Sequence, residues 1–154
     1  MKANSIIVSV FFIISISLFY GCEKEVNISD SEIPSEIVDY VNTHFMGIKI
    51  LQATQEKEGI FKKYEIYLEG GIFLEFNRKK EIIEIESSNK LPDSVIPEKI
   101  RQYVADKFAE NFITDWKKER NEQKVELDNE SEIIFTKDGA FLRFDWLKDF
   151  KELE

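Results

Sequence analysis

The sequence predicts an α+β fold in which two tandem units, each a helix followed by an antiparallel meander, form one sheet with both helices packed on one face. Three observations support this prediction. The segment IPSEIVDYVNTHF, from Ile33, returns as IPEKIRQYVADKF, from Ile96, at a constant offset of 63 residues. Each segment spaces its apolar residues by three and four, as an amphipathic helix does. Each is followed by runs in which apolar and polar residues alternate, as in one-sided strands.

Residues 1–21 are typical of an export signal. Lys2 precedes an uncharged stretch rich in Ile, Val and Phe, which ends at Gly21 and Cys22. This stretch is shorter than the roughly 20 residues that a membrane-spanning helix needs, and a small residue lies at the cleavage position. Cys22 is the only cysteine of the chain, so no internal disulfide can form.

The segment LFYGC, at residues 18–22, resembles the lipobox of bacterial lipoproteins, although Phe19 and Tyr20 replace the Leu and the small residue that a lipobox prefers. The resemblance implies that the signal is cut before Cys22 and that this cysteine carries lipid. The protein would then be anchored in the cell envelope, on the periplasmic or the surface face of the outer membrane, with residues 22–32 as a polar tether. The alternative is an ordinary signal peptide followed by a spacer cysteine.

The first unit is expected to cover residues 33–87. Pro34 fits the first helical position, where a missing N–H costs nothing, and apolar residues at 37, 40, 41, 45 and 48 form one buried stripe. Alternation then predicts strands near residues 48–55, 63–69, 72–76 and 83–85, with turns at 70–71 and 77–80. The turn-like segment SSNKLPDS, at residues 87–94, joins this unit to the second.

The second unit, residues 96–154 with a short C-terminal tail, repeats this order. Pro97 opens its helix, and residues 100, 103, 104, 108 and 112 form its buried stripe. Strands are expected near residues 112–118, 124–127, 133–135 and 142–146, with turns at 128–131 and 137–139. Because helices cover one face of such a sheet, the other face is expected to be open.

This arrangement resembles the PepSY-like family, also described as β-lactamase-inhibitor-like. The shared features are the lipoprotein-type signal, the two proline-opened helices, and meanders with KYEI from Lys63, KVEL from Lys124 and the pattern G-x-x-apolar-x-F ending at Phe76. The resemblance spans about residues 33–146 and implies a two-repeat α+β fold whose open sheet face grips a protein. Its inhibitor relatives are typically braced by disulfides, which this chain cannot form, so a β-lactamase is not carried over as the partner.

The charge balance excludes two classes of partner. The chain has a net charge of −9, and residues 22–154 alone carry −10, since Lys2 is the only charged residue before them. Nucleic acids and anionic bilayers need clustered Lys and Arg to neutralise phosphates, so no nucleic-acid partner is expected. A hydrophobic content of 43%, with 13% aromatic residues, is enough for a folded core.

Residues able to carry out catalysis are scarce. No cysteine remains once Cys22 is lipidated, no Gly-rich phosphate loop is present, and His44 is the only histidine. Its repeat equivalent is Lys107, a residue that prefers water, so His44 is interpreted as a helix residue at the solvent edge rather than a general base. Acid pairs such as Glu84 and Glu86 share the solvated face of a strand. We therefore expect no catalytic residue, no cofactor and no metal ligand.

A cation site is the alternative hypothesis. The hairpin DNESE, at residues 128–132, offers hard oxygen donors at alternating positions, as expected of a small-ligand or calcium carrier of the envelope. It lacks the Gly and the terminal bidentate Glu that make a calcium loop specific. A solvated hairpin tip explains the same residues.

Large apolar residues interrupt the charged residues on the face that is expected to be open. The candidate partner-binding residues there are Tyr67, Phe73, Ile82, Ile134, Phe141 and Arg143. An aromatic cluster with a charged rim is typical of a protein-binding hot spot, whereas the alternative is cross-strand pairing that steadies an exposed sheet. The leading hypothesis is a non-enzymatic envelope lipoprotein that binds an unidentified envelope protein and, in its stronger form, inhibits it.

Overall fold

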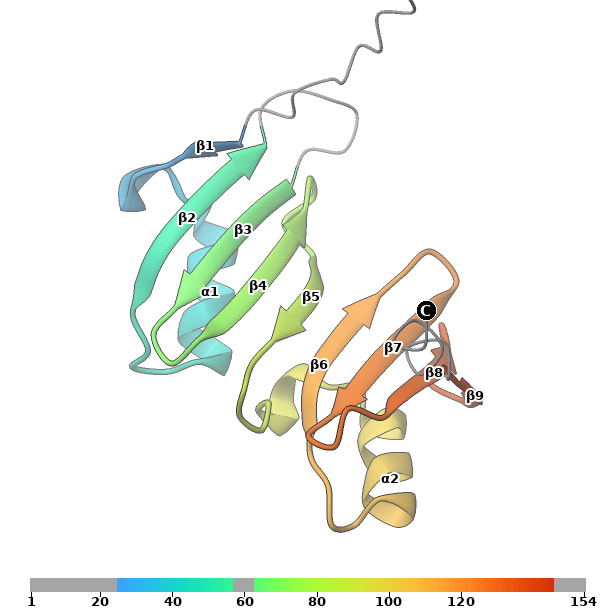
Figure 1. Ribbon diagram of the computed structural model, residues 1–154. Coiled ribbons are helices and arrows are strands. Elements are labelled where there is room, and N and C mark those ends of the chain that lie inside the picture. The colour runs from blue at the N-terminus through green and yellow to red at the C-terminus, as the bar shows by residue number, and fades with distance from the viewer. Residues whose placement is uncertain (1–24, 57–62, 146–154) are drawn as a thin grey trace, which may run out of the picture.

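The computed structural model describes residues 25–56 and 63–145, which form one nine-stranded antiparallel sheet with its strands in chain order (Figure 1). The strands are β1 (Glu25–Asn27), β2 (Ile50–Glu56), β3 (Lys63–Leu68), β4 (Ile72–Asn77), β5 (Ile82–Glu86), β6 (Ile113–Lys118), β7 (Glu122–Leu127), β8 (Glu132–Thr136) and β9 (Phe141–Phe144). The helices are α1 (Ser35–His44) and α2 (Glu98–Lys107), and two short 3-10 turns are η1 (Asp30–Glu32) and η2 (Asp93–Val95). The predicted α+β fold is confirmed, including the strands expected near residues 48–55 and 112–118.

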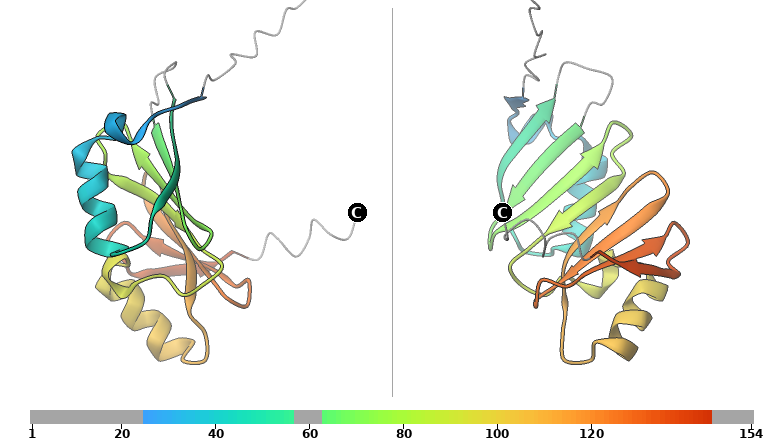
Figure 2. Two further views of the ribbon diagram at one scale, coloured as in Figure 1. Left: turned by 90° about the vertical axis from the view of Figure 1, so that its left-hand side faces the viewer. Right: turned by 45° about the vertical axis from the view of Figure 1, so that its right-hand side comes forward.

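Both helices pack on the same side of the sheet, α1 behind β2–β5 and α2 behind β6–β9 (Figure 2). The two units bury equivalent aromatic residues. Tyr40 of α1 meets the edge of Phe76 at 5.3 Å between ring centroids, and Tyr103 of α2 meets Phe135 at 5.4 Å in the same T-shaped geometry. Phe76 and Phe135 are fully buried. The sequence repeat is therefore a repeat of the core.

Each helix begins one residue later than the sequence suggests. Pro34 and Pro97 precede the first helical residue and keep an extended backbone, with ψ of 138° and 135°. Each proline carbonyl accepts the first hydrogen bonds of its helix, for example from the N–H of Ile37 at 3.0 Å and from that of Ile100 at 3.0 Å. Proline suits this place because it has no N–H of its own to satisfy.

Part of the segment expected to be a tether is folded. Within residues 22–32, strand β1 pairs with β2. Ile28 is only 9% exposed, and its N–H donates a hydrogen bond of 3.0 Å to the carbonyl of Ala53. A capping box between Ser29 and Glu32 opens η1. The short run of Val26 to Ile28 supplies too little alternation to predict an edge strand. The export signal, Cys22 and the start of the tether lie outside the described residues. Among the residues described, no helix is long and apolar enough to span a membrane.

The two units meet at the pairing of β5 with β6, which we call the seam. Its register joins Glu84 to Lys117, Ile85 to Trp116 and Glu86 to Asp115. Ile85 and Trp116 are buried, and the indole N–H of Trp116 donates to Oε1 of Gln123 at 2.9 Å. The seam therefore makes one continuous sheet from two repeats.

Ile82 faces the core and not the open face on which it was predicted, because β5 contains a β-bulge. The register between β4 and β5 shifts between Glu75 and Phe76, so that Phe76 lies opposite Ile82 while Glu75 lies opposite Glu84. Ile82 consequently packs against the core and does not reach the open face. The extra residue of a bulge interrupts strict alternation, and alternation was the basis of the prediction.

An equivalent bulge in the second unit turns Phe141 away from the open face, on which it was predicted to lie. The register shifts between Ile134 and Phe135, and Phe141 lies opposite buried Phe135. Its ring stacks on Tyr103 of α2, with centroids 5.0 Å apart and an interplanar angle of 7°. Phe141 therefore belongs to the helix side of the sheet, although 40% of it is exposed.

Candidate functional site

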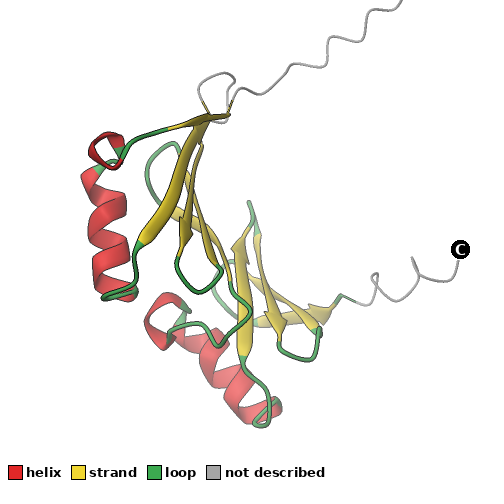
Figure 3. Ribbon diagram, turned by 60° about the vertical axis from the view of Figure 1, so that its left-hand side comes forward, coloured by secondary structure: helices red, strands yellow, loops and turns green. Residues whose placement is uncertain are grey.

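The sheet face opposite α1 and α2, here called the open face, is the candidate site. No helix among residues 25–56 and 63–145 lies on it (Figure 3). Two rows of side chains cross this face, each formed by residues paired on successive strands. The aromatic–acidic row consists of Tyr67, Phe73, Glu86, Asp115, Glu126 and Glu132. The mixed row consists of Glu65, Glu75, Glu84, Lys117, Lys124, Ile134 and Arg143.

Two aromatic residues form one end of the aromatic–acidic row. Tyr67 of β3 lies directly opposite Phe73 of β4, and their ring centroids are 5.1 Å apart. Tyr67 is 40% exposed and Phe73 is half-buried. The alternation of β3 and β4 predicts this pair correctly, because Ile66 and Leu74 beside it face the core. The pair presents apolar area within a charged sheet face.

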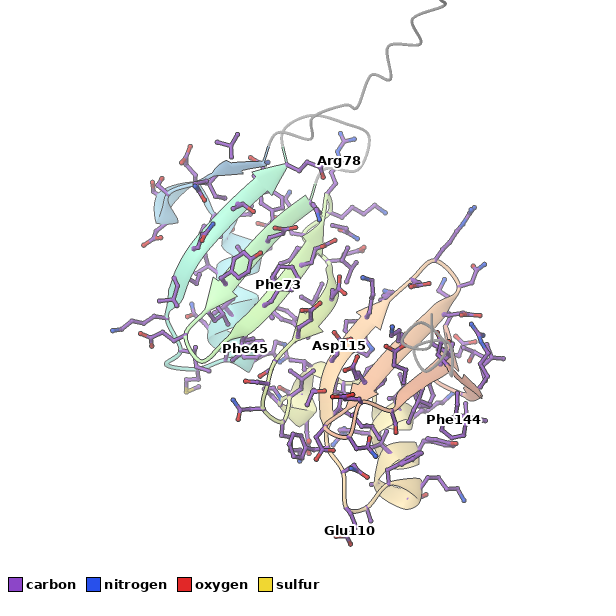
Figure 4. The ribbon with its side chains drawn as sticks, viewed as in Figure 1. Phe45, Phe73, Arg78, Glu110, Asp115 and Phe144 are labelled. Atoms are coloured by element: carbon purple, nitrogen blue, oxygen red, sulfur yellow. The ribbon has the colours of Figure 1, made fainter. Side chains whose placement is uncertain are left out.

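Carboxylates form the other end of this row. Glu86, Asp115 and Glu126 lie opposite one another on β5, β6 and β7, and Figure 4 shows Asp115 on the sheet beside the strand end of β5. Burial, followed by the charges of Glu86 and Glu84, raises the pKa of Asp115 to about 7. Burial and the charge of Glu84 also raise the pKa of Glu86. Like charges directly opposite on a sheet oppose each other, so this part of the fold is electrostatically unfavourable by itself.

Three of these acids come close enough to share a ligand. Glu84, Glu86 and Asp115 can each place one carboxylate oxygen within 4.8 Å of those of the other two. Glu84 also contacts Lys117, whose ammonium lies 2.6 Å from Oε1 of Glu84. Burial would lower the pKa of Lys117, but its hydrogen bond to Glu84 and the nearby carboxylates raise it.

Lysines balance the mixed row more fully than the aromatic–acidic row. Lys63 contacts Glu65 at 2.7 Å and Glu75 at 3.2 Å, and Lys124 contacts Glu132 at 2.6 Å. Lys63 and Lys117 thus contact acids of the mixed row, and Lys124 contacts Glu132, the β8 residue of the aromatic–acidic row. Negative charge is therefore concentrated around the seam.

A depression of about 380 Å³ lies at this concentration of charge. Phe73 forms its aromatic wall, while Glu86, Asp115 and Glu126 supply carboxylates. Its remaining lining residues are Gly71, Ser87, Ser88 and Thr114. Apolar area and negative charge thus meet in one hollow of the open face.

The remaining candidates in the second unit lie apart from the aromatic pair. Ile134 is on the open face, between Lys124 and Arg143, but is only 4% exposed and offers little area to a partner. Arg143 is exposed, and its guanidinium donates two hydrogen bonds, each of 2.9 Å, to the carboxylate of Glu122. The structure therefore brings Tyr67 and Phe73 together but separates them from Ile134 and Arg143.

The hairpin at residues 128–132 uses its oxygens within the fold. Oδ1 of Asp128 accepts hydrogen bonds from the side chain of Asn111 at 2.9 Å and from the N–H of Phe112 at 3.2 Å. Oδ1 of Asn129 accepts the N–H of Ser131 at 3.2 Å. These contacts explain the residues as turn and strand-end structure.

The acidic cluster at the seam was not predicted from the sequence. Alternation places Glu84 and Glu86 on one face of one strand, but Asp115 joins them only through the pairing of β5 with β6. The repeat places Asp115 at the position of Gln52 in the first unit. The replacement of Gln by Asp at this repeated position, on a strand next to the acidic strand β5, is the sequence feature that could have indicated the cluster.

His44 bridges the two units. It is the last residue of α1, its Nδ1 lies 2.9 Å from Oγ of Ser94, and its ring packs on Tyr40 at 4.4 Å between centroids. Ser94 belongs to η2, in the segment that leads to α2. The contact gives His44 a structural partner.

The fold and the open face define a two-repeat α+β protein with an exposed sheet surface. The chain belongs to the PepSY-like family: the family profile described as "Putative beta-lactamase-inhibitor-like, PepSY-like" matches it twice, at residues 21–84 and 62–143. Two matches along the chain agree with the tandem arrangement. None of the curated proteins compared matches the chain.

Solved structures show the same fold. A "putative periplasmic protein of unknown function" from Bacteroides vulgatus is 26% identical, with a TM-score of 0.74 over 79% of this chain and 99% of its own. A second "putative periplasmic protein" from that organism is 25% identical, with a TM-score of 0.75 over 81% and 99%. A "putative calcium-regulated periplasmic protein" from Bacteroides thetaiotaomicron is 22% identical, with a TM-score of 0.74 over 79% and 96%. The neighbours are thus described as proteins of the cell envelope.

Proposed function

We propose that this protein is a non-enzymatic binding module of the cell envelope, which docks on another envelope protein through its open face. The observation that carries the proposal is the contact of Tyr67 with Phe73 on a face that both helices leave uncovered. Exposed aromatic residues surrounded by charges are typical of the energetic centre of a protein interface. The inhibitor-like description of the family supports a binding role, with inhibition of the partner as its stronger form.

Sheet stability is the competing explanation for this aromatic pair. Cross-strand aromatic pairs stabilise a sheet by roughly 0.2–1 kcal/mol, whether or not a partner binds. The two explanations differ in what replacing the rings abolishes. A stabilising pair affects unfolding alone, whereas a docking surface also determines capture of a partner.

The corrected position of Phe141 supplies a matched control for the test. Wild type, a Tyr67→Ala and Phe73→Ala double variant, and Phe141→Ala would each be used to capture proteins from an envelope extract. We expect the double variant to lose a specifically captured protein and Phe141→Ala to keep it, since Phe141 packs against Tyr103 on the helix side. Equal capture by all three proteins would contradict the assignment of the open face.

We propose further that the protein is exported and held at the membrane by lipid on Cys22. The uncharged segment before Cys22 supports export, and the periplasmic description of the structural neighbours supports an envelope location. Two or more acyl chains anchor stably, because each buried methylene contributes about 0.8 kcal/mol. Cys22→Ala is expected to release the protein from membranes, and retention under high salt would contradict the lipid anchor.

A calcium site is the second candidate function, favoured by the oxygens of Glu84, Glu86 and Asp115 within 4.8 Å of one another. The neighbour described as calcium-regulated agrees with this candidate. Calcium prefers six to eight oxygen ligands, and here three carboxylates converge while Lys117 already contacts Glu84. Such a donor set fits weak binding, on the order of the 10⁻⁴–10⁻³ M typical of extracellular modules.

Calcium binding predicts a rise in melting temperature across millimolar calcium chloride, because the ligand would bind the folded state alone. Asp115→Asn is expected to remove that rise, while Asp39→Asn on α1 preserves it. A wild-type protein whose melting temperature does not change in calcium, relative to sodium chloride of equal ionic strength, would exclude this candidate.

A further inference from the structure

The hollow at the seam combines an acidic surface with an aromatic one. Its carboxylates come from three successive strands, with Asp115 between Glu86 and Glu126. Its wall on β4 is the ring of Phe73, the cross-strand partner of Glu86. Acid and aromatic groups thus lie side by side in one row, and one depression of about 380 Å³ touches both.

The nearby lysines leave this hollow acidic. Lys117 makes its 2.6 Å contact with Glu84, in the mixed row. Lys124 makes its 2.6 Å contact with Glu132, at the β8 end. Neither Lys117 nor Lys124 lines the hollow. An additional cation there would offset repulsion among carboxylates that the fold places opposite one another.

The aromatic wall distinguishes among possible cations. A metal ion takes oxygen ligands and would make no use of a phenyl ring. A lysine or arginine side chain has an apolar stem that packs on a ring and a charged head attracted both to carboxylates and to the ring face. The guanidinium of arginine also matches carboxylates with paired hydrogen bonds. The lining therefore fits a basic side chain better than a bare ion.

We propose that the hollow formed by Phe73, Glu86, Asp115 and Glu126 receives a lysine or arginine side chain from a basic segment of the partner protein. This inference rests on the proposed docking function of the open face and names the chemistry of its occupant. The basic side chain and the hollow have complementary charges: the cationic head lies among the carboxylates of β5, β6 and β7, and its stem lies on Phe73. Tyr67, in contact with Phe73, extends the apolar support toward β3.

The repeat confines this chemistry to the seam. The first unit pairs Gln52 with Tyr67 where the second pairs Asp115 with Glu126, because the bulges of β2 and β6 fall at equivalent places in the two registers. Only the neighbourhood of β4, β5 and β6 therefore brings an aromatic end and an acidic end together among the described strands. The partner would therefore bind at the junction of the two units and not to either unit alone.

The test uses two short probes that differ in charge alone. An acetylated and amidated Gly-Arg-Gly-Arg-Gly peptide and its citrulline counterpart would be titrated into the purified protein, with backbone amide shifts as the readout. We expect the arginine peptide to shift amides of β4–β7 around Gly71, Phe73 and Asp115. The citrulline peptide, which has nearly the same shape without the charge, is expected to leave them unchanged.

Matched variants separate the hollow from general acidity. The pair Glu86→Gln and Asp115→Asn is expected to weaken arginine-peptide binding at least about tenfold, because two carboxylates contact the head. The control pair, Glu110→Gln and Asp39→Asn, replaces the same number of carboxyl groups at exposed positions and is expected to change binding less than about twofold. Phe73→Leu is expected to weaken it about threefold to fivefold, through loss of the ring–cation contact.

Equal weakening by the two double variants would overturn the proposal, and so would arginine-peptide shifts centred away from β4–β7. Absence of binding at millimolar peptide would also overturn it. Each of these outcomes leaves the docking function separately testable, since the capture experiment with Tyr67→Ala and Phe73→Ala does not depend on a basic partner. If the arginine peptide fails to bind at the hollow and the Tyr67→Ala and Phe73→Ala variant still captures the partner, both the basic occupant and the docking function are rejected.

Discussion

Glu86 of β5 lies directly opposite Asp115 of β6, so the pairing that joins the two repeats also sets two carboxylates against each other. Their pKa values are both raised, with burial as the first cause. A sheet joined for stability alone would place opposite charges or apolar residues at this position. The fold instead keeps an acidic hollow beside Phe73, at the junction that makes one sheet from two units.

The raised pKa of Asp115 predicts how stability depends on pH. Folding moves this pKa from 3.8 to about 7, so the folded state holds a proton that the unfolded state has released between these values. Because the folded state binds more protons there, the free energy of unfolding should fall as the pH rises from about 4 to about 7. Asn carries no such proton. Asp115→Asn is therefore expected to stabilise the protein, with a larger gain at pH 8 than at pH 5.

Urea unfolding midpoints at the two pH values measure this gain. Asp39→Asn, on the exposed surface of α1, is the control, and its effect should be small and equal at both. A gain from Asp115→Asn that does not change between pH 5 and pH 8 would contradict the proposed electrostatic state of the seam.

Lys117 is predicted to stabilise the seam through Glu84. The Glu84 carboxylate is mostly buried, and its 2.6 Å contact with the ammonium of Lys117 offsets the neighbouring acids. Lys117→Met keeps the apolar stem but removes that charge, and should lower the free energy of unfolding by about 1–3 kcal/mol. Lys49→Met is the comparison, because Lys49 contacts Glu69 at 3.8 Å with both side chains exposed, and should change stability by less than about 0.5 kcal/mol. Equal effects in urea unfolding would show that Lys117 has no special role.

Phe141 is predicted to stabilise the second unit and to play no part in docking. Its ring stacks on Tyr103 with an interplanar angle of 7°, while 40% of the residue stays exposed. Phe141→Ala should lower the free energy of unfolding by roughly 1–2 kcal/mol, mostly through the lost stack. Leu142→Ala, at the exposed bulge residue beside it, should have a smaller effect. A Phe141→Ala protein with wild-type stability and lost partner capture would return Phe141 to the binding site.

The turn that leads into β9 is predicted to require glycine for two reasons. Gly139 has φ of +81°, and a Cβ built there would lie 3.2 Å from Cβ of Lys99 on α2. Gly139→Ala should therefore cost about 2 kcal/mol or more, from backbone strain plus displacement of the helix. Gly47 has φ of +80° with open space around it, so Gly47→Ala should cost about 1 kcal/mol. Equal losses in thermal unfolding would mean that the turn does not press on α2.

The sequence repeat predicts the fold well because the repeated apolar positions are those buried in the core. Ile37 and Ile100, at matching places in the two helices, are both fully buried, and the alternation around Ile66 correctly separates core residues from Tyr67. Such patterns depend on which side of an element faces water, and burial enforces that choice at each position. The α+β class and both strand meanders follow from it.

Local irregularity and long-range register account for what the sequence did not predict. One extra residue in β5 turns Ile82 toward the core, and the equivalent residue in β9 does the same to Phe141, because a bulge interrupts the period of two. Asp115 joins Glu86 through the register of the seam, which depends on tertiary packing of two units. The lipid anchor proposed at Cys22 lies outside the described residues and rests on the sequence alone.

The central claim is that the open face contacts a partner in the envelope, and site-specific photo-crosslinking in cells tests it most directly. A benzoyl-phenylalanine at position 67 lies on the open face, and one at position 102 lies on the exposed surface of α2 as a control. We predict a discrete crosslinked species from position 67 that is absent from position 102. The same crosslinks from both positions, or crosslinks from position 102 alone, would contradict the account.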